Sequence, residues 1–167
     1  GAIHPFRRVF NAWWPRALQA RPCGPIIRDM SDSQKFPVAA HALAYLAHKG
    51  AFRVEDAVSS AELAASMPTN PVVVRRVTAM LGKAGLVGSR SGAGGGAWLT
   101  RAPETIRLDE VLEAVDGCTK LGVPPKGVDG CPVGAKIPDA IRGAITAADQ
   151  AAHTRLAAIS VADLLKG

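Results

Sequence analysis

The sequence predicts a mainly α-helical fold that contains one small two-stranded hairpin. Hydrophobic residues make up 48% of the 167 residues and aromatic residues only 5%. Much of the apolar content is alanine, which is a strong helix former. Asn70-Pro71 precedes a run with helical periodicity, and four glycines fall between Ser91 and Gly96 with short apolar runs on either side. These observations indicate helices that lead into a glycine-rich hairpin.

The positive charge of the chain is concentrated at its beginning. The formal net charge is +6, and residues 1–29 hold five Arg against one Asp, a balance of +4. This segment lacks a sustained apolar period, so we interpret residues 1–29 as a leader or a basic extension outside the fold, with Met30 as a plausible natural start. An arm that follows DNA is the less favoured alternative. No apolar run reaches the ~18–20 residues that a membrane helix needs, so we expect no membrane partner.

The first two expected helices cover residues 36–49 and 59–66. Gly50 ends the first helix, because glycine readily adopts the left-handed conformation that follows a helix C-terminus. The second helix begins at a Ser-x-x-Glu capping box formed by Ser59 and Glu62, whose side chains satisfy free backbone N–H groups. Two short helices in this order suit the first part of a helix-turn-helix unit.

The third expected helix extends from Pro71 to about Ala84. Asn70 is a suitable N-cap, and proline fits the first helical position because its missing N–H would have no intrahelical partner there. The side chains of Arg75 and Arg76 are turned away from the apolar face of this helix. That face is expected to be buried and consists of Val74, Val77 and Leu81.

Two short strands are expected at residues 86–87 and 97–99, joined by the glycine-rich turn of residues 91–96. Glycine allows close approach of another backbone, but the turn lacks the Gly-Lys-Ser/Thr ending of a phosphate loop. Three helices followed by such a hairpin form a winged helix-turn-helix, which we assign to residues 30–107. In this fold the third helix enters the major groove of DNA.

The remainder of the chain is expected to form a short helix, a loop and a long helix. We assign the short helix and a sensor loop to residues 108–134, and a dimerisation helix to residues 135–167. The long helix should begin at Pro138 or Asp139 and end near Leu165. An apolar helix that projects from a small domain needs a partner, so we expect a homodimer, whose twofold symmetry suits a palindromic operator. Packing on its own domain is the alternative.

Several motifs resemble those of the Rrf family of bacterial winged-helix transcription regulators, and they cover almost everything after Met30. Residues 69–76 and 131–134 are similar to one branch of the family that includes thiol-based sensors. The other matching segments are Ala-His-Ala-Leu-Ala-Tyr-Leu-Ala at 40–47, Ala-Glu-Leu-Ala at 61–64, Lys-Ala-Gly-Leu-Val at 83–87, the three glycines at 94–96, Ala-Pro-Glu-Thr-Ile at 102–106 and Leu-x-x-Val-Leu-x-Ala-Val-x-Gly at 108–117.

The resemblance implies a cytoplasmic homodimer that binds a double-stranded DNA operator, with repression as the preferred mode. Arginine suits bidentate contact with guanine, worth ~1–3 kcal/mol of discrimination. Arg90 lies one position before the usual wing arginine, and pairing of Arg75 with a nearby acid is the structural alternative. Trp98 is expected to be a packing residue. The residues at positions where family members contact DNA are Thr69, Asn70, Val72, Arg75, Arg76, Ser89, Arg90, Ser91 and Gly95.

Cys118 and Cys131 are the two cysteines in the expected sensor loop. Family members with an iron–sulfur cluster usually have three there, and a cluster needs three or four ligands, so we expect no cofactor and no metal site. Cys131 precedes a helix start, where the thiolate is favoured, so a thiol switch with Cys118 as the resolving thiol is one hypothesis. Two inert cysteines are an equally supported alternative. Control by an atypical cluster, or by a small molecule between the domains, stays open.

Two other function classes are considered. The four histidines are scattered at residues 4, 41, 48 and 153, and no nucleophile and base lie at an informative spacing, so no catalytic residue and no enzyme is expected. A winged helix that binds other proteins instead of DNA is the second class. Reversal of Arg75 and Arg76 to Glu would separate it from a DNA-binding regulator.

Overall fold

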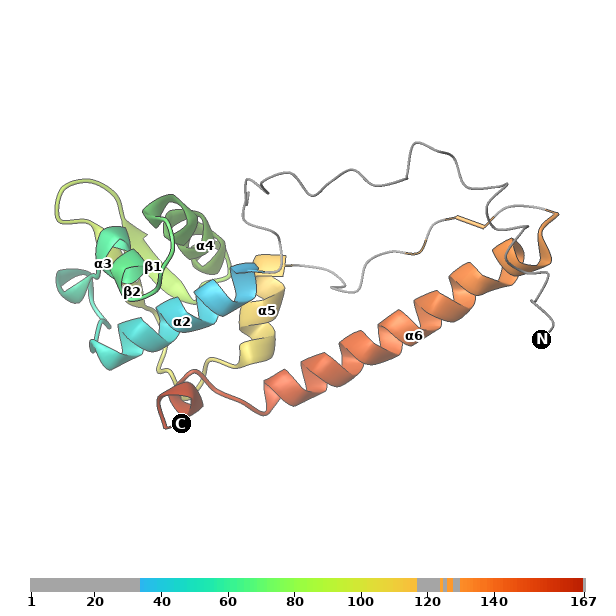
Figure 1. Cartoon of the computed structure of the whole chain (residues 1–167). Helices are drawn as coiled ribbons and strands as arrows, with labels where there is room; N and C mark the ends of the chain where they lie inside the picture. Colours follow the sequence, from blue (N-terminus) through green and yellow to red (C-terminus); the bar gives the residue numbers. More distant parts are fainter. Residues whose placement is uncertain (1–33, 117–123, 125, 128–129, 167) are drawn as a thin grey trace, which may run out of the picture.

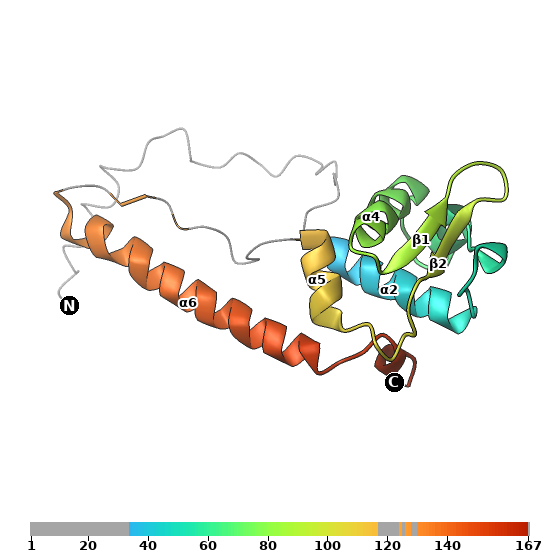
Figure 2. The same cartoon turned by 180° about the vertical axis from the view of Figure 1, so that it is seen from behind.

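The computed structural model describes residues 34–116, 124, 126–127 and 130–166. Helices α2 to α5 and a two-stranded hairpin gather into one body, and α6 extends away from it (Figures 1 and 2). This arrangement confirms a mainly α-helical winged helix-turn-helix. The elements in chain order are α2 (Lys35–His48), the 3₁₀ turn η3 (Val54–Asp56), α3 (Ser60–Ala65), α4 (Pro71–Lys83), β1 (Val87–Arg90), β2 (Gly96–Leu99), α5 (Leu108–Asp116), α6 (Pro132–Ala157) and the 3₁₀ turn η4 (Ala162–Leu165).

The starts of α3 and α4 are where the capping residues predict them. The Ser59 hydroxyl accepts a hydrogen bond of 3.1 Å from the N–H of Glu62. The Asn70 side chain accepts one of 2.9 Å from the N–H of Val72, and Pro71 follows in the first turn. Each side chain satisfies an N–H group that the helix itself leaves without a partner.

The Glu62 carboxylate joins α3 to the end of α2 rather than completing the expected capping box. It lies 2.9 Å from Lys49 Nζ and accepts a hydrogen bond of 3.2 Å from the Tyr45 hydroxyl. The Lys49 ammonium lowers the pKa of Glu62, and the carboxylate raises the pKa of Lys49. The first turn of α3 is therefore attached to α2 by polar contacts at the edge of the body.

One hydrophobic core joins α2, α4, α5 and the hairpin. The predicted buried face of α4 is confirmed, because Val74, Val77 and Leu81 are at most 1% exposed. Val161, which follows α6 in the chain, is fully buried in the same core. The other fully or almost fully buried large side chains are Leu43, Leu46, Leu63, Leu86, Leu99, Ile106 and Val111.

Strands β1 and β2 form an antiparallel pair that we call the wing, together with the turn of residues 91–95. Val87 is paired with Leu99 and Arg90 with Gly96. Gly88 lies opposite Trp98, and a Cβ atom on Gly88 would lie 2.4 Å from the indole ring. The half-buried Trp98 thus covers the hairpin backbone, which is the packing role expected for it.

The predicted bounds of the long helix are wrong at both ends. Helix α6 begins at Pro132, with Cys131 as its N-cap, and Pro138 lies inside it. Pro138 has no N–H group, so it removes one backbone hydrogen bond from the interior of this helix, which nevertheless continues past it. The helix stops at Ala157, so residues up to 165 are not part of it. None of the helices in the described part of the chain is long and apolar enough to span a membrane.

Backbone pairing with the segment before α5 ends the long helix. The Leu108 N–H donates to the Ile159 carbonyl at 3.0 Å, and the Val161 N–H donates to the Ile106 carbonyl at 2.9 Å. These bonds turn the chain away from the axis of α6 and bring Val161 into the core. Because the pairing is between distant residues, the local helical periodicity does not reveal it.

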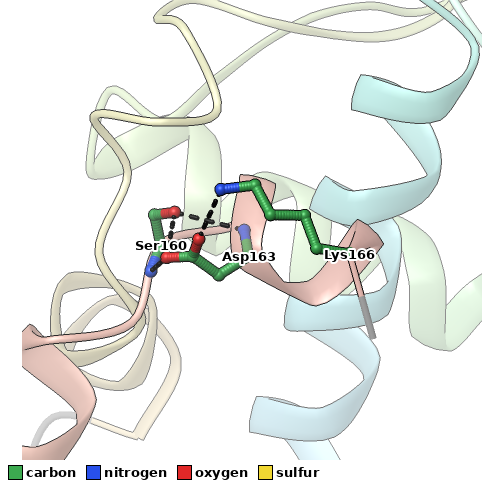
Figure 3. A network of polar contacts seen from close by, with 3 residues as sticks. All are labelled: Ser160, Asp163 and Lys166. Atoms are coloured by element: carbon green, nitrogen blue, oxygen red, sulfur yellow. Dashed lines mark hydrogen bonds and ion pairs between the residues drawn. The ribbon is translucent and has the colours of Figure 1, made fainter.

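A polar network fastens the C-terminal turn η4 to the end of this pairing (Figure 3). The Asp163 carboxylate accepts hydrogen bonds from the N–H and the hydroxyl of Ser160, at 3.0 and 2.7 Å. Its other oxygen lies 2.8 Å from Lys166 Nζ. Lys166 and Ser160 together hold the pKa of Asp163 well below its usual range. The network fixes the chain reversal that follows α6.

Candidate nucleic-acid interface

Helix α4 has a buried face and an outward face that differ in composition. Successive residues are rotated by about 100°, so a residue and those three, four or seven positions away share a face. Val74, Val77, Thr78 and Leu81 are buried against the body. The outward face is exposed and consists of Val72, Arg76, Ala79 and Lys83. The apolar side chain of Val72 on this face is 51% exposed.

A cavity of about 300 Å³ lies between α4 and the wing. Arg75, Thr78 and Ala79 line it from α4, and Ser60 and Leu63 line it from α3. The wing contributes the remaining wall, and Val58 closes the cavity beside β2. The wing residues that line it are Ser89, Arg90, Ser91, Gly92, Gly95, Gly96 and Ala97.

The wing turn is closed by backbone contacts that require glycine. The Gly95 N–H donates to the Gly92 carbonyl at 3.0 Å, and Gly92 has a positive φ of 97°. A Cβ atom on Gly95 would lie 2.2 Å from the Arg90 carbonyl oxygen. The guanidinium of Arg90 donates a 3.3 Å hydrogen bond to the Gly94 carbonyl. These contacts hold Arg90 beside the cavity. Any side chain at residue 95 would collide with the Arg90 carbonyl and force the turn open.

Four exposed cationic side chains lie on α4 and the wing. They are Arg75, Arg76, Lys83 and Arg90, and none of them forms an ion pair within the part of the chain that the structure describes. The expected alternative of an acidic partner for Arg75 is therefore not seen there. Arg101, which follows β2 in the chain, differs from them because it forms an ion pair with Glu110 on α5.

The structure separates the predicted DNA-contacting residues into three groups. Arg75, Ser89, Arg90, Ser91 and Gly95 meet at the cavity. Thr69 and Asn70 border a shallow depression at the turn between α3 and α4. The remaining two lie on the outward face of α4 and are Val72 and Arg76.

Two polar side chains at this surface were missed at the sequence level. Lys83 lies on the outward face seven residues after Arg76, and this helical spacing could have identified it. Ser60 lines the cavity, but the serine before it is the helix cap, and its own sequence position gives no sign of a second role. Both extend the polar surface beyond the predicted set.

Comparisons with known proteins decide the family. The family model Rrf2, described as an iron-dependent transcriptional regulator, matches residues 32–167. The chain belongs to the Rrf2 family. It is 34% identical over 134 residues to the HTH-type transcriptional regulator YwnA of Bacillus subtilis (strain 168), covering 80% of this chain and 96% of YwnA. The Rrf2 chain is therefore a transcription regulator and not an enzyme, as expected.

Solved structures support the same fold. A crystal structure of a transcriptional regulator from Lactobacillus plantarum superposes with a TM-score of 0.66 at 28% identity, covering 80% of this chain and 88% of that one. A second crystal structure, of a DNA-binding protein, superposes with a TM-score of 0.60 at 35% identity, covering 78% of this chain and 98% of that one. The chain thus spans nearly the whole length of these relatives.

The described residues of this Rrf2 chain do not fit an iron–sulfur cluster. A cluster needs three or four suitable ligands. No group of three or more His, Cys, Asp or Glu able to hold a metal is found among the described residues. Cys131 is exposed, and its thiol accepts a 3.3 Å hydrogen bond from the N–H of Gly134. Cys118 lies outside the described residues.

Proposed function

We propose that this Rrf2-family regulator is a sequence-specific repressor that binds a double-stranded DNA operator through α4 and the wing. The observation that carries this proposal is the exposed cationic surface of α4 and the wing, which has no ion-pair partner in the described part of the chain. A helix with exposed cations at its outward face suits the major groove, and a basic hairpin beside it suits the backbone and minor groove. The relative described as a DNA-binding protein supports the proposal.

Reversal of both arginines of α4 tests DNA binding. A duplex is first enriched from a random pool by the wild-type protein, and its affinity is then measured by fluorescence anisotropy. Arg75→Glu/Arg76→Glu should lower the affinity by about 100-fold or more, because favourable contacts become repulsive. Arg53→Glu/Arg155→Glu is the matched control, since both side chains are exposed elsewhere and the net charge changes equally. Equal affinity of wild type and the α4 variant would refute the proposal.

Homodimerisation through α6 is part of the proposal. Helix α6 has 26 residues, and its first half carries Val133, Ile137 and Ile141 at 66%, 46% and 45% exposure. Spacing of four residues places these side chains along one side of the helix. A second copy of the chain would cover this apolar strip and would supply the twofold symmetry of a palindromic operator.

A thiol switch is the proposed control of DNA binding, without a resident cofactor. Cys131 is exposed at the N-terminus of α6, where the N–H of Gly134 donates a hydrogen bond of 3.3 Å to its sulfur. In the proposed step the thiolate attacks a hydroperoxide, the O–O bond breaks, and a sulfenic acid and an alcohol or water form. Attack by the Cys118 thiol then forms the disulfide and releases water.

The redox proposal is tested by single cysteine variants and hydrogen peroxide. Cys131→Ser should bind the enriched duplex like the reduced wild type and should no longer respond to peroxide. Cys118→Ser should still form the sulfenic acid but no disulfide, which mass spectrometry detects. An unchanged peroxide response of Cys131→Ser would exclude the switch. Stoichiometric iron in anaerobically purified protein would exclude the cofactor-free form of the proposal.

A further inference from the structure

Arg75 and Arg76 are adjacent in sequence but lie on different sides of α4. The rotation of about 100° between neighbouring residues places Arg76 on the outward face with Val72 and Lys83. Arg75 lies on the side toward the wing, where it lines the cavity together with Thr78. Arg76 is not among the residues that line the cavity. The two guanidinium groups therefore meet different parts of any DNA that α4 contacts.

The cavity between α4 and the wing has the chemistry of an anion site. Among the residues that line it are the cationic Arg75 and Arg90 and three serines that carry hydroxyl groups, Ser60, Ser89 and Ser91. Among the described residues, no Asp or Glu lines it. Guanidinium and hydroxyl groups are the usual donors to phosphate oxygens. The volume of about 300 Å³ leaves room for a phosphate group and its bridging waters.

The position of the cavity matches the path of a DNA strand. Helix α4 lies beside the wing in both views of the fold (Figures 1 and 2). When such a helix occupies the major groove and the wing reaches the minor groove, a sugar–phosphate backbone separates the two grooves and passes between the two elements. The space between α4 and the wing is therefore where a backbone phosphate would lie.

We infer that this cavity binds one backbone phosphate of the operator through Arg75 and Arg90, and that Arg76 is the arginine of the pair that reads base edges. The inference rests on the proposed DNA binding and assigns separate tasks within it. Phosphate contacts position a protein on the duplex and carry no direct sequence information, whereas base contacts specify the sequence. The cavity thus sets the register at which the outward face of α4 meets the bases.

Alanine substitution of each arginine tests this division of tasks. Wild type, Arg75→Ala and Arg76→Ala are titrated with the enriched duplex and with a series of single base-pair substitutions at several KCl concentrations. Arg75→Ala should weaken binding to every duplex by a similar factor, and the slope of log affinity against log salt should fall by about one. Arg76→Ala should reduce discrimination at one base pair by about 5- to 150-fold. Circular dichroism checks that both exposed substitutions leave the fold intact.

Methylphosphonate substitution identifies the source of the phosphate. One uncharged methylphosphonate is placed at each backbone position of a half-site in turn. At one position it should weaken wild type, weaken Arg75→Ala less, and leave Arg75→Ala/Arg90→Ala unaffected, because both contacts are then missing. Arg90→Ala should show the same reduced sensitivity at the same position. Such a result assigns the cavity to the DNA backbone.

Three outcomes would overturn the inference while leaving DNA binding intact. They are loss of base preference in Arg75→Ala, an unchanged salt slope in that variant, and the absence of any methylphosphonate position at which Arg75→Ala is less sensitive than wild type and Arg75→Ala/Arg90→Ala is insensitive. If in that last case wild type binds inorganic phosphate saturably without DNA and Arg75→Ala does not, the cavity is a site for free phosphate. Failure of the wild type to retain any duplex would instead reject the proposed function itself.

Discussion

The body formed by α2 to α5 and the wing differs from α6 in how its apolar side chains are used. In the body, residues such as Leu43 and Leu81 are at most 1% exposed. Within α6, all of which the structure describes, no residue is buried. Only the end of α6 reaches the core, where Leu156 is partly buried against it. A single chain therefore buries the apolar side chains of the body, whereas the apolar strip of α6 stays exposed to water.

This difference indicates a division of work between the two regions. The body has its own core and presents the cationic surface of α4 and the wing. Packing normally supplies most helix stability in proteins, and a helix of 26 residues without one buried residue gains little from it. We therefore expect the stability of α6 to depend on packing against a second copy of the chain, and the stability of the body to depend on its own core.

The largest expected effect comes from a cavity in the body. Leu81→Ala should lower the free energy of unfolding by about 2–5 kcal/mol, because a fully buried side chain is truncated in a packed core. Ile141→Ala in α6 removes similar atoms from an exposed site and should cost less. Urea denaturation at two protein concentrations measures both. The Ile141→Ala effect should depend on concentration, since it acts through the dimer. If Leu81→Ala and Ile141→Ala lowered the free energy of unfolding by the same amount at both protein concentrations, the proposed difference between the body and α6 would be wrong.

The second effect is on association. Ile137→Asp/Ile141→Asp should weaken the dimer by about 100-fold or more, because each buried isoleucine contributes about 1.5–3 kcal/mol and 1.4 kcal/mol corresponds to a factor of ten. Thr146→Asp/Gln150→Asp adds the same charge at exposed positions on another side of α6 and is the matched control. Sedimentation velocity measures the dissociation constant. If both variants remain dimeric, the apolar strip is not the interface.

A third, smaller effect tests the local start of α4. Asn70→Ala removes the side chain that accepts the Val72 N–H and should cost about 0.5–2 kcal/mol of unfolding free energy. Asn70→Asp retains an acceptor and should restore most of the stability. Thermal unfolding of the two variants gives the comparison. An equal loss in both would show that capping does not stabilise this helix.

The smallest effect concerns the C-terminal network. The pKa of Asp163 lies well below its usual range in the folded protein, so its contribution to stability is fully present above the unfolded pKa, near 4, and is lost progressively as the pH falls from there through the lower folded pKa. Asp163→Asn should therefore lower the urea midpoint most at pH 7, and the difference from wild type should shrink progressively as the pH falls below about 4. The midpoint of both proteins is measured across this range. A pH-independent difference would show that the charge of Asp163 does not act through Ser160 and Lys166.

Local signals in the sequence were sufficient for the body of the fold. The caps at Ser59 and Asn70 act within three residues, so the starts of α3 and α4 could be predicted without tertiary information. This does not hold for the end of α6. Its end depends on backbone pairing of Ile159 and Val161 with the segment before α5, and a bond between residues so far apart in sequence leaves no local pattern.

The sequence predicted the types of residue that form the candidate site, but not how they are arranged in space. The sequence indicates that Arg75 and Arg76 both point away from the core. Only the placement of the wing beside α4 shows that Arg75 lines a cavity with Arg90 while Arg76 does not. Ser60 joins the same cavity from α3 through tertiary packing, so no spacing rule along the chain relates it to the wing.

The symmetry of the preferred DNA site tests the account most directly. A symmetric site requires that the body reads base sequence and that α6 joins two copies of the chain into a dimer. Wild type and Ile137→Asp/Ile141→Asp are each used to enrich duplexes from the same random pool, which is then sequenced. We predict that wild type enriches inverted repeats with half-sites about one helical turn apart, and that the variant enriches single half-sites weakly. Enrichment of asymmetric sites by the wild type, or of the same inverted repeats by a monomeric variant, would contradict the account.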